Sequence, residues 1–127
     1  MNPVLFLGAL LGLLSVIIGA SAEHLVQQRV EPEVWRWMMT AIRYHQIGAV
    51  VVTAVGLGLA AGAVPTRRLN LAAGFLVAGT VLFSFSIYAA AVTGIDSLTY
   101  VTPLGGVTLM FGWLLLAWAA LGVGKSQ

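Results

Sequence analysis

The sequence has 127 residues, of which 60% are hydrophobic and only 8% are charged, and its mean hydropathy is +0.99. A soluble domain of this length carries about 25% charged residues to cover its surface, so the composition indicates a membrane protein with the lipid bilayer as its partner. Six basic residues against four acidic ones form no basic stripe, and we expect no nucleic-acid partner. Because cysteine is absent, disulfides, thiol catalysis and cysteine-based metal sites are excluded.

Four apolar stretches are long enough to cross a bilayer core, which is about 30 Å thick and takes roughly 20 helical residues. The predicted spans are residues 3–22, 44–64, 71–93 and 102–123. Asn2 and Thr102 each precede a proline, and we expect them to cap the first and fourth spans. The predicted fold class is therefore all-α, a membrane-embedded four-helix bundle that forms one domain over residues 1–127.

The first stretch has a second interpretation as a secretory signal peptide, because Ala20, Ser21 and Ala22 resemble a small-residue cleavage site. The residues ahead of it include no Lys or Arg, and its apolar run is longer than the h-region of a signal peptide, which has about 7–15 residues. We therefore expect this stretch to be retained as a span.

The connector between the first two spans, residues 23–43, is the one polar stretch of any length. Its polar residues recur at spacings of 3, 4 and 3, which keeps them on one stripe of a helix: Glu33, Arg36, Thr40 and Arg43. Trp35, Trp37 and Tyr44 are suited to the headgroup level. The pattern predicts an amphipathic helix at the bilayer interface between spans one and two. A short soluble hairpin docked on the bundle is the alternative.

The distribution of Lys and Arg gives an orientation. An even number of spans places the N-terminus, the turn at Pro65-Thr66-Arg67-Arg68 and Lys125 on one side, and the three arginines of the connector on the other. Two adjacent arginines in a very short loop favour a cytoplasmic location for both termini.

Small residues follow one face of three spans, and such faces allow helices to approach closely in a membrane. The residues are Gly8, Gly12, Ser15, Gly19 and Ala22 in span one, Ala73, Thr80, Ser84, Tyr88 and Ala91 in span three, and Gly105, Thr108, Gly112 and Ala119 in span four. Gly58 and Gly62 form a further GxxxG pair near the end of span two. The hydroxyls at positions 80, 84 and 86 are expected to bond backbone carbonyls or neighbouring helices.

A polar layer is expected where spans one and three end and spans two and four begin. Its candidate binding residues are Glu23, His24, Tyr44, His45 and Asp96. Two histidines on neighbouring helices can ligate a haem or a metal ion, and a carboxylate, an imidazole and a tyrosine can bind a quinone headgroup. The simpler interpretation is that water and headgroups satisfy these side chains.

Other chemistry has little support in the sequence. No acidic or basic residue falls in the central part of a predicted span, which argues against proton-coupled transport. The nucleophile elbow G-x-S-x-G, a phosphate-binding loop and the zinc motif H-E-x-x-H are all missing. We therefore expect no enzymatic activity, no metal and no cofactor.

Two segments carry a family resemblance. Residues 79–88, GTVLFSFSIY, are followed by TPLGG at 102–106 and by Gly112-Trp113. This order resembles the YgdD-like family, a domain of unknown function in small four-span bacterial inner-membrane proteins. The resemblance implies a multi-pass inner-membrane protein, loosely linked to envelope integrity, with no established enzymatic activity.

The first half of the chain matches the family less closely. At the end of span one the family reads approximately GAFGAH; Gly19, Ala20 and His24 match it, whereas residues 21–23 depart. The family also has a histidine four residues after the tyrosine that opens span two, where this chain has Gly48.

The sequence thus predicts a non-enzymatic structural or accessory membrane protein that forms a homo-oligomer or joins a larger membrane complex. The alternative is a quinone- or haem-binding protein that uses the polar layer around His24 and His45.

Overall fold

A computed structural model describes residues 1–62 and 64–123. The described chain is all-α and contains four stretches of helix that are long and apolar enough to cross a membrane. The principal helices are α1 (Pro3–Ser21), α2 (Pro32–Ala61), α3 (Thr66–Thr80), α4 (Ser86–Thr93) and α5 (Thr102–Ala120). Shorter helical turns are η1 (Ala22–Val26), η2 (Gln27–Arg29), η3 (Val81–Phe85) and η4 (Asp96–Val101). Because η3 joins α3 directly to α4, these three elements form the third span.

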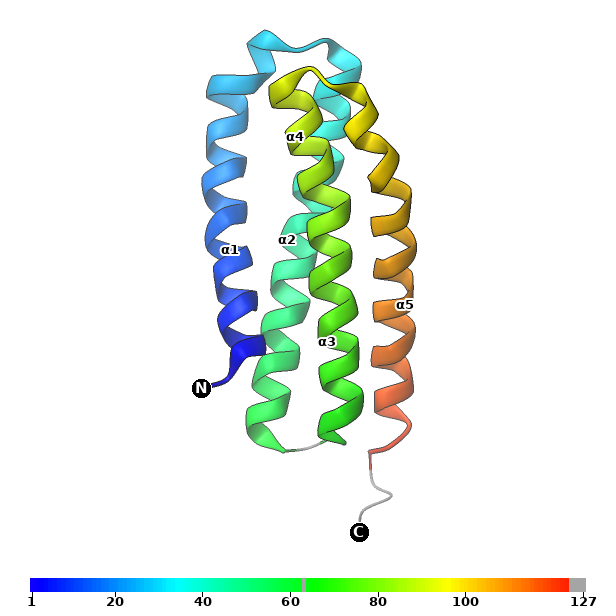
Figure 1. The fold of residues 1–127 in the computed structure, drawn as a ribbon. Coiled ribbons are helices and arrows are strands. Elements are labelled where there is room, and N and C mark those ends of the chain that lie inside the picture. The colour runs from blue at the N-terminus through cyan, green and yellow to red at the C-terminus, as the bar shows by residue number, and fades with distance from the viewer. Residues whose placement is uncertain (63, 124–127) are drawn as a thin grey trace.

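The spans run side by side and alternate in direction (Figure 1). The connections from α1 to α2 and from α4 to α5 lie at one end of the bundle, which we call the loop end. The N-terminus, the end of α2, the start of α3 and the end of α5 lie at the opposite end. α1 packs along α2, α5 packs along α3, and contacts between α2 and α3 join the two pairs.

Asn2 begins α1 as the sequence predicts. Its side-chain Oδ1 accepts a hydrogen bond from the Leu5 backbone N–H at 3.0 Å, which satisfies one of the donors that a helix start leaves unpaired. Its Nδ2 also donates to the backbone carbonyl of Gly56 at 2.8 Å. One side chain therefore caps α1 and ties it to α2.

Replacing Asn2 separates these two contributions. We expect Asn2→Ala to lower the free energy of unfolding by about 1–2 kcal/mol, because it removes both the cap and the bond to Gly56. Asn2→Asp keeps an acceptor for the cap but loses the Nδ2 donor, so its loss should be smaller. Denaturant unfolding of the purified protein in mixed micelles measures both values. Equal losses in the two variants would contradict the cap.

The predicted interfacial helix is not a separate element, and this part of the prediction is wrong. α2 begins at Pro32 and continues without a break to Ala61, so the expected second span is only the later part of a 30-residue helix. Met38, Ala41 and Ile42 are buried against the rest of the bundle, and this packing keeps the segment upright with the other spans. Arg36 and Arg43 remain on the exposed side, as the polar stripe predicts.

Three local predictions near the helix ends also differ from the structure. Arg67 and Arg68 lie in the first turn of α3, which starts after Pro65. Gly62 is the left-handed residue that ends α2, with φ of +68°, so it is the cap of this helix and not a residue within the span. Thr102 is the first residue of α5, and its side chain makes no cap.

Arg68 ties the start of α3 to the end of α5. Its guanidinium carbon lies 4.1 Å from the centre of the Trp118 ring, and its Nη1 donates to the Trp118 backbone carbonyl at 3.2 Å. A cation over an indole face is attracted by the ring quadrupole. Lys125 also counts toward the predicted membrane orientation, but it lies outside the described residues. The orientation itself stays a prediction.

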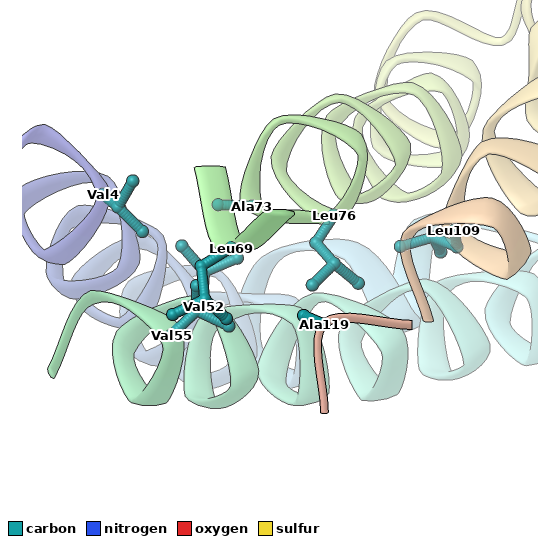
Figure 2. Packing of buried hydrophobic residues seen from close by; sticks show 8 residues of the cluster. All are labelled: Val4, Val52, Val55, Leu69, Ala73, Leu76, Leu109 and Ala119. Carbon is teal, nitrogen blue, oxygen red and sulfur yellow. The ribbon is translucent and has the colours of Figure 1, made fainter. Parts of the chain in front are cut away.

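The core has two apolar clusters. The first gathers side chains from all four spans and is shown in Figure 2: Val4, Val52, Val55, Leu69, Ala73, Leu76, Leu109 and Ala119. The second lies nearer the loop end: Ala22, Met38, Ala41, Ile42, Ile87 and Tyr88. The small-residue faces predicted for spans one, three and four are buried or half-buried, which confirms them as packing faces.

Candidate functional site

His45 forms the polar centre of the bundle. It comes from α2, is 0% exposed, and its Nδ1 lies 2.9 Å from the phenolic oxygen of Tyr88 on α4. Either atom can be the donor, depending on which ring nitrogen carries the proton. His45 therefore points into the bundle, and its partner is a side chain of the third span.

Phe85 completes an aromatic cluster with this pair. Its ring centre lies 5.2 Å from that of His45 and 5.3 Å from that of Tyr88, in tilted or edge-on arrangements. Such geometries place ring edges against ring faces and are favourable beyond the apolar area they bury. We call His45, Phe85 and Tyr88 the core ring cluster.

A wide helical turn positions the third span for these contacts. η3 is π-helical, and such a turn shifts the phase of the side chains that follow it. Ser84, within η3, donates its hydroxyl to the Ala41 carbonyl at 2.8 Å, and Tyr88 meets His45 one turn further along. Residues 41 and 45 on α2 thus face residues 84 and 88, so two polar contacts fix the register between the two spans.

The second ring nitrogen of His45 has no such partner. Nε2 is buried and makes no hydrogen bond, although the backbone of Leu11 on α1 approaches the imidazole. A buried polar atom without a partner costs stability and calls for an explanation in each case. The same ring makes a hydrogen bond at Nδ1 and aromatic contacts with Phe85 and Tyr88.

The five candidate binding residues do not form one group. Glu23 and His24 lie exposed on η1, and Asp96 lies exposed at the start of η4. Because α2 begins at Pro32, His45 sits 13 residues into the helix, which places it about 20 Å from the start of α2. The expected layer is therefore divided between the loop end and the interior.

The positions of the candidate residues bear on whether they can bind a metal ion. Tyr44 is partly exposed and packs edge-on against Phe83 at 5.2 Å between ring centres, whereas its neighbour His45 is buried. Within the part of the chain that the structure describes, no group of three or more His, Asp or Glu residues is close enough to hold a metal ion. Binding of a haem or a quinone stays a prediction.

The intramembrane hydroxyls confirm a prediction from the sequence. Thr80 donates to the Leu76 carbonyl at 2.7 Å, and Ser86 donates to the Phe83 carbonyl at 2.9 Å. The Ser86 oxygen also lies 2.6 Å from that of Thr102, so this pair links the third span to α5. Sequence reasoning placed Tyr88 on a buried face but did not find its bond to His45. The π-helical turn at 81–85 has no recognisable sequence signal.

Comparison with known proteins identifies the family. A family model described as a protein of unknown function, DUF423, matches residues 18–106. The UPF0382 membrane protein YwdK of Bacillus subtilis is 36% identical over 126 residues, which cover 95% of this chain and 98% of the relative. The UPF0382 inner membrane protein YgdD of Escherichia coli K12 is 30% identical over 122 residues, covering 93% of this chain and 88% of that protein.

A similar relative from Haemophilus influenzae, also named a UPF0382 membrane protein, is 32% identical over 119 residues, or 94% of each chain. No solved structure matches. The four spans and the YgdD relatives together indicate a multi-pass protein of the inner membrane. The resemblance seen in the sequence is confirmed, and the chain belongs to the DUF423/UPF0382 family of small membrane proteins.

Proposed function

We propose that the protein is a non-enzymatic accessory membrane protein that associates with a second copy of itself through α3. The observation that carries this proposal is Gly74, which lies in the middle of α3 and faces outward. A Cβ added there would meet nothing within 4 Å. Elsewhere in the described helices, away from the left-handed caps, an added Cβ meets another part of the bundle.

An outward glycine inside a helix needs a reason, because glycine costs about 1 kcal/mol relative to alanine at such a position. Asn70, Gly74 and Ala78 follow one another at a spacing of four, and all three are exposed. We call these three residues the α3 face. It borders a shallow hollow of about 280 Å³ that Thr108 of α5 also lines. Small residues in this arrangement allow two transmembrane helices to approach closely.

A second copy is the occupant that this surface favours. In a two-fold symmetric dimer the same patch is used by both partners, so each small face meets another small face. Asn70 Nδ2 already donates to the Thr66 carbonyl at 3.0 Å, which holds the amide on the helix surface where a partner's polar group can reach it. Hydrogen bonds between helices add to such contacts in a membrane.

The use of the interior polar groups supports a role without catalysis. Ser84 bonds a carbonyl of α2, and Thr80 bonds one of its own helix. His45 and Tyr88 bond each other in the core. These side chains therefore serve packing within the bundle.

Single-cysteine crosslinking in native membranes tests the proposal, because the sequence has no cysteine of its own. We expect the Gly74→Cys and Ala78→Cys variants to form disulfide-linked dimers on mild oxidation. Ala9→Cys, at an exposed position of α1, is the matched control and should stay monomeric. Adding Gly74→Leu to Ala78→Cys should lower dimer yield at least severalfold, because a large side chain separates the helices.

Equal crosslinking at Ala9 and at the α3 face would indicate random collision and would reject the interface. A product at the α3 face that is heavier than two chains would replace the second copy with a subunit of a larger membrane complex.

A further inference from the structure

A groove runs between α2 and α5. These two helices do not pack along each other in the described residues, and three hollows follow one another between them. The hollow nearest the loop end has a volume of about 410 Å³ and shares Phe83 with the next, of about 260 Å³. The second shares Ile47, Val51 and Trp113 with the third, of about 470 Å³. The shared residues place the three hollows next to one another in a row, and we call this row the groove.

The groove is longer than one leaflet of a bilayer and shorter than the whole bilayer. Arg36 lines its first hollow, and Ala54 lines its third. Eighteen residues of helix separate them and rise about 27 Å. One leaflet with its headgroups is about 20–22 Å thick, and the whole bilayer is about 40–45 Å thick. The groove is therefore long enough for the headgroup and acyl chain of one lipid, whereas a transmembrane helix of a partner protein would need a surface along the whole bilayer.

The groove is polar at its mouth and apolar below. Arg36 and Thr40 line the mouth, together with Trp37, and the walls below are formed by side chains such as Ile47, Val51 and Leu109. The hydroxyls at the mouth already have partners within the protein; Thr40, for example, donates to the Arg36 carbonyl at 3.1 Å. Recognition of a headgroup anion therefore falls mainly to the Arg36 guanidinium.

Two oppositely charged side chains lie at the mouth of the groove. Arg36 Nη2 lies 3.8 Å from Glu33 Oε1, and both side chains are largely exposed, at 74% and 68%. The loop end as a whole carries one more acid than base: Glu23, Glu31, Glu33 and Asp96 against Arg29, Arg36 and Arg43. This balance does not favour a headgroup with net negative charge. It matches one that carries a phosphate and an amine together.

We propose that this groove binds one molecule of a zwitterionic glycerophospholipid with a primary amine, of the phosphatidylethanolamine type. Its phosphate contacts Arg36, its ammonium contacts Glu33, and one acyl chain lies in the groove between α2 and α5. A primary ammonium donates hydrogen bonds to a carboxylate, whereas the quaternary amine of a choline headgroup has no hydrogen to donate. This site is separate from the α3 face and does not depend on self-association.

Native mass spectrometry of the full chain measures the bound lipid. The purified protein is delipidated, exposed to mixed vesicles with equal amounts of phosphatidylethanolamine, phosphatidylcholine and phosphatidylglycerol, and then transferred to the spectrometer. We expect one lipid to be retained per chain, with the ethanolamine lipid favoured severalfold over the other two.

Gly106→Leu tests whether the lipid lies in the groove. Gly106 lines the second hollow, and a Cβ there meets the Phe83 ring at 3.8 Å, an ordinary contact, so the longer side chain extends into the hollow without displacing the backbone. We expect lipid retention to fall about tenfold. Ala9→Leu, at an exposed position of α1, which lines none of the three hollows, is the control and should retain lipid as the unaltered protein does. Circular dichroism verifies that both variants are folded.

Two substitutions at the mouth separate the headgroup contacts. Arg36→Gln should lower retention of all three lipids about tenfold, because each has a phosphate. Glu33→Gln should remove only the preference for the ethanolamine lipid. Arg43→Gln, further along the same exposed stripe but outside the groove, should change neither property.

The proposal is overturned if the unaltered chain retains no lipid, or if it takes phosphatidylglycerol as readily as the ethanolamine lipid. Equal retention by Gly106→Leu and Ala9→Leu would place the lipid elsewhere. A bound mass that matches a quinone would show that the groove serves a different ligand.

Discussion

Gly105→Ala is expected to destabilise the bundle by about 1–3 kcal/mol, the range that overpacking of a close-packed site typically costs. A Cβ at this position would lie 2.7 Å from the Leu82 carbonyl carbon and would overlap the Phe83 backbone nitrogen. Backbone atoms in a helix cannot move aside as the end of a flexible side chain can. Alanine is otherwise the better helix former by about 1 kcal/mol, so the steric cost must outweigh a favourable change.

The adjacent glycine provides the control. At Gly106 the nearest atoms to an added Cβ belong to the Phe83 ring at 3.8 and 3.9 Å, so Gly106→Ala should be neutral or stabilise the protein by up to about 1 kcal/mol. Unfolding in mixed micelles, with helical content as the signal, measures both variants under one set of conditions. If the two substitutions shift stability in the same direction and by the same amount, close approach at Gly105 is not what holds α5 against the third span.

Glycines allow close approach of the helices within each of the two pairs. A Cβ at Gly8 would lie 2.6 Å from the Thr53 backbone nitrogen, and one at Gly56 would lie 2.6 Å from the Leu5 Cα. Lipid chains are as apolar as leucine, so helices in a membrane gain little from burying apolar surface against each other and depend on close contact instead. The same physics explains why a sequence with so few charges carries so many small residues on defined faces.

The sequence predicts the spans because the signals for them are local. Scarce charge marks the apolar stretches, and Asn2 with Pro3 marks a helix start that the structure confirms. The small-residue faces follow from the 3.6-residue period of the helix and are likewise confirmed. These features depend on neighbours in the chain and need no knowledge of the packed bundle.

The connector could not be predicted in the same way. An amphipathic stripe over residues 33–43 is equally compatible with a helix lying on the membrane and with one standing in the bundle. Packing selects the helix that stands in the bundle, because Met38 and Ala41 are buried in a cluster that includes Ile87 of the third span. Because that contact joins residues more than 40 positions apart, no local pattern could reveal it.

The candidate site likewise combines features that follow from local sequence with features that depend on tertiary structure. The helical period puts His45 on one face of α2 with Ala49 and Gly56, and that face is buried. Its bond to Tyr88 depends on the π-helical turn at 81–85, which shifts the side chains that follow. Residues 81–85 read as ordinary apolar helix, so the pairing follows from tertiary structure alone.

A double-mutant cycle on His45 and Tyr88 measures how much this pair contributes. Tyr88→Phe should destabilise the protein by about 1–3 kcal/mol, because it leaves both ring nitrogens of a fully buried imidazole without a hydrogen-bond partner. His45→Leu, which has similar volume, leaves the Tyr88 hydroxyl unpaired but also removes Nε2, which is unpaired already. The double variant removes every unpaired polar atom at once. We therefore expect it to be more stable than Tyr88→Phe alone, with a coupling energy of about 1 kcal/mol or more.

The signs of these changes distinguish a hydrogen-bonded pair from two side chains that merely fill space. Space-filling residues would give losses that add, and the double variant would then be the least stable of the three. Tyr44→Phe is the matched control, since Tyr44 is beside His45 in sequence but partly exposed, and losing its hydroxyl should change stability by less than about 0.5 kcal/mol. Because Ser84 and Tyr88 contact α2 one turn apart, a coupling at His45 also measures how strongly the register between the second and third spans is fixed.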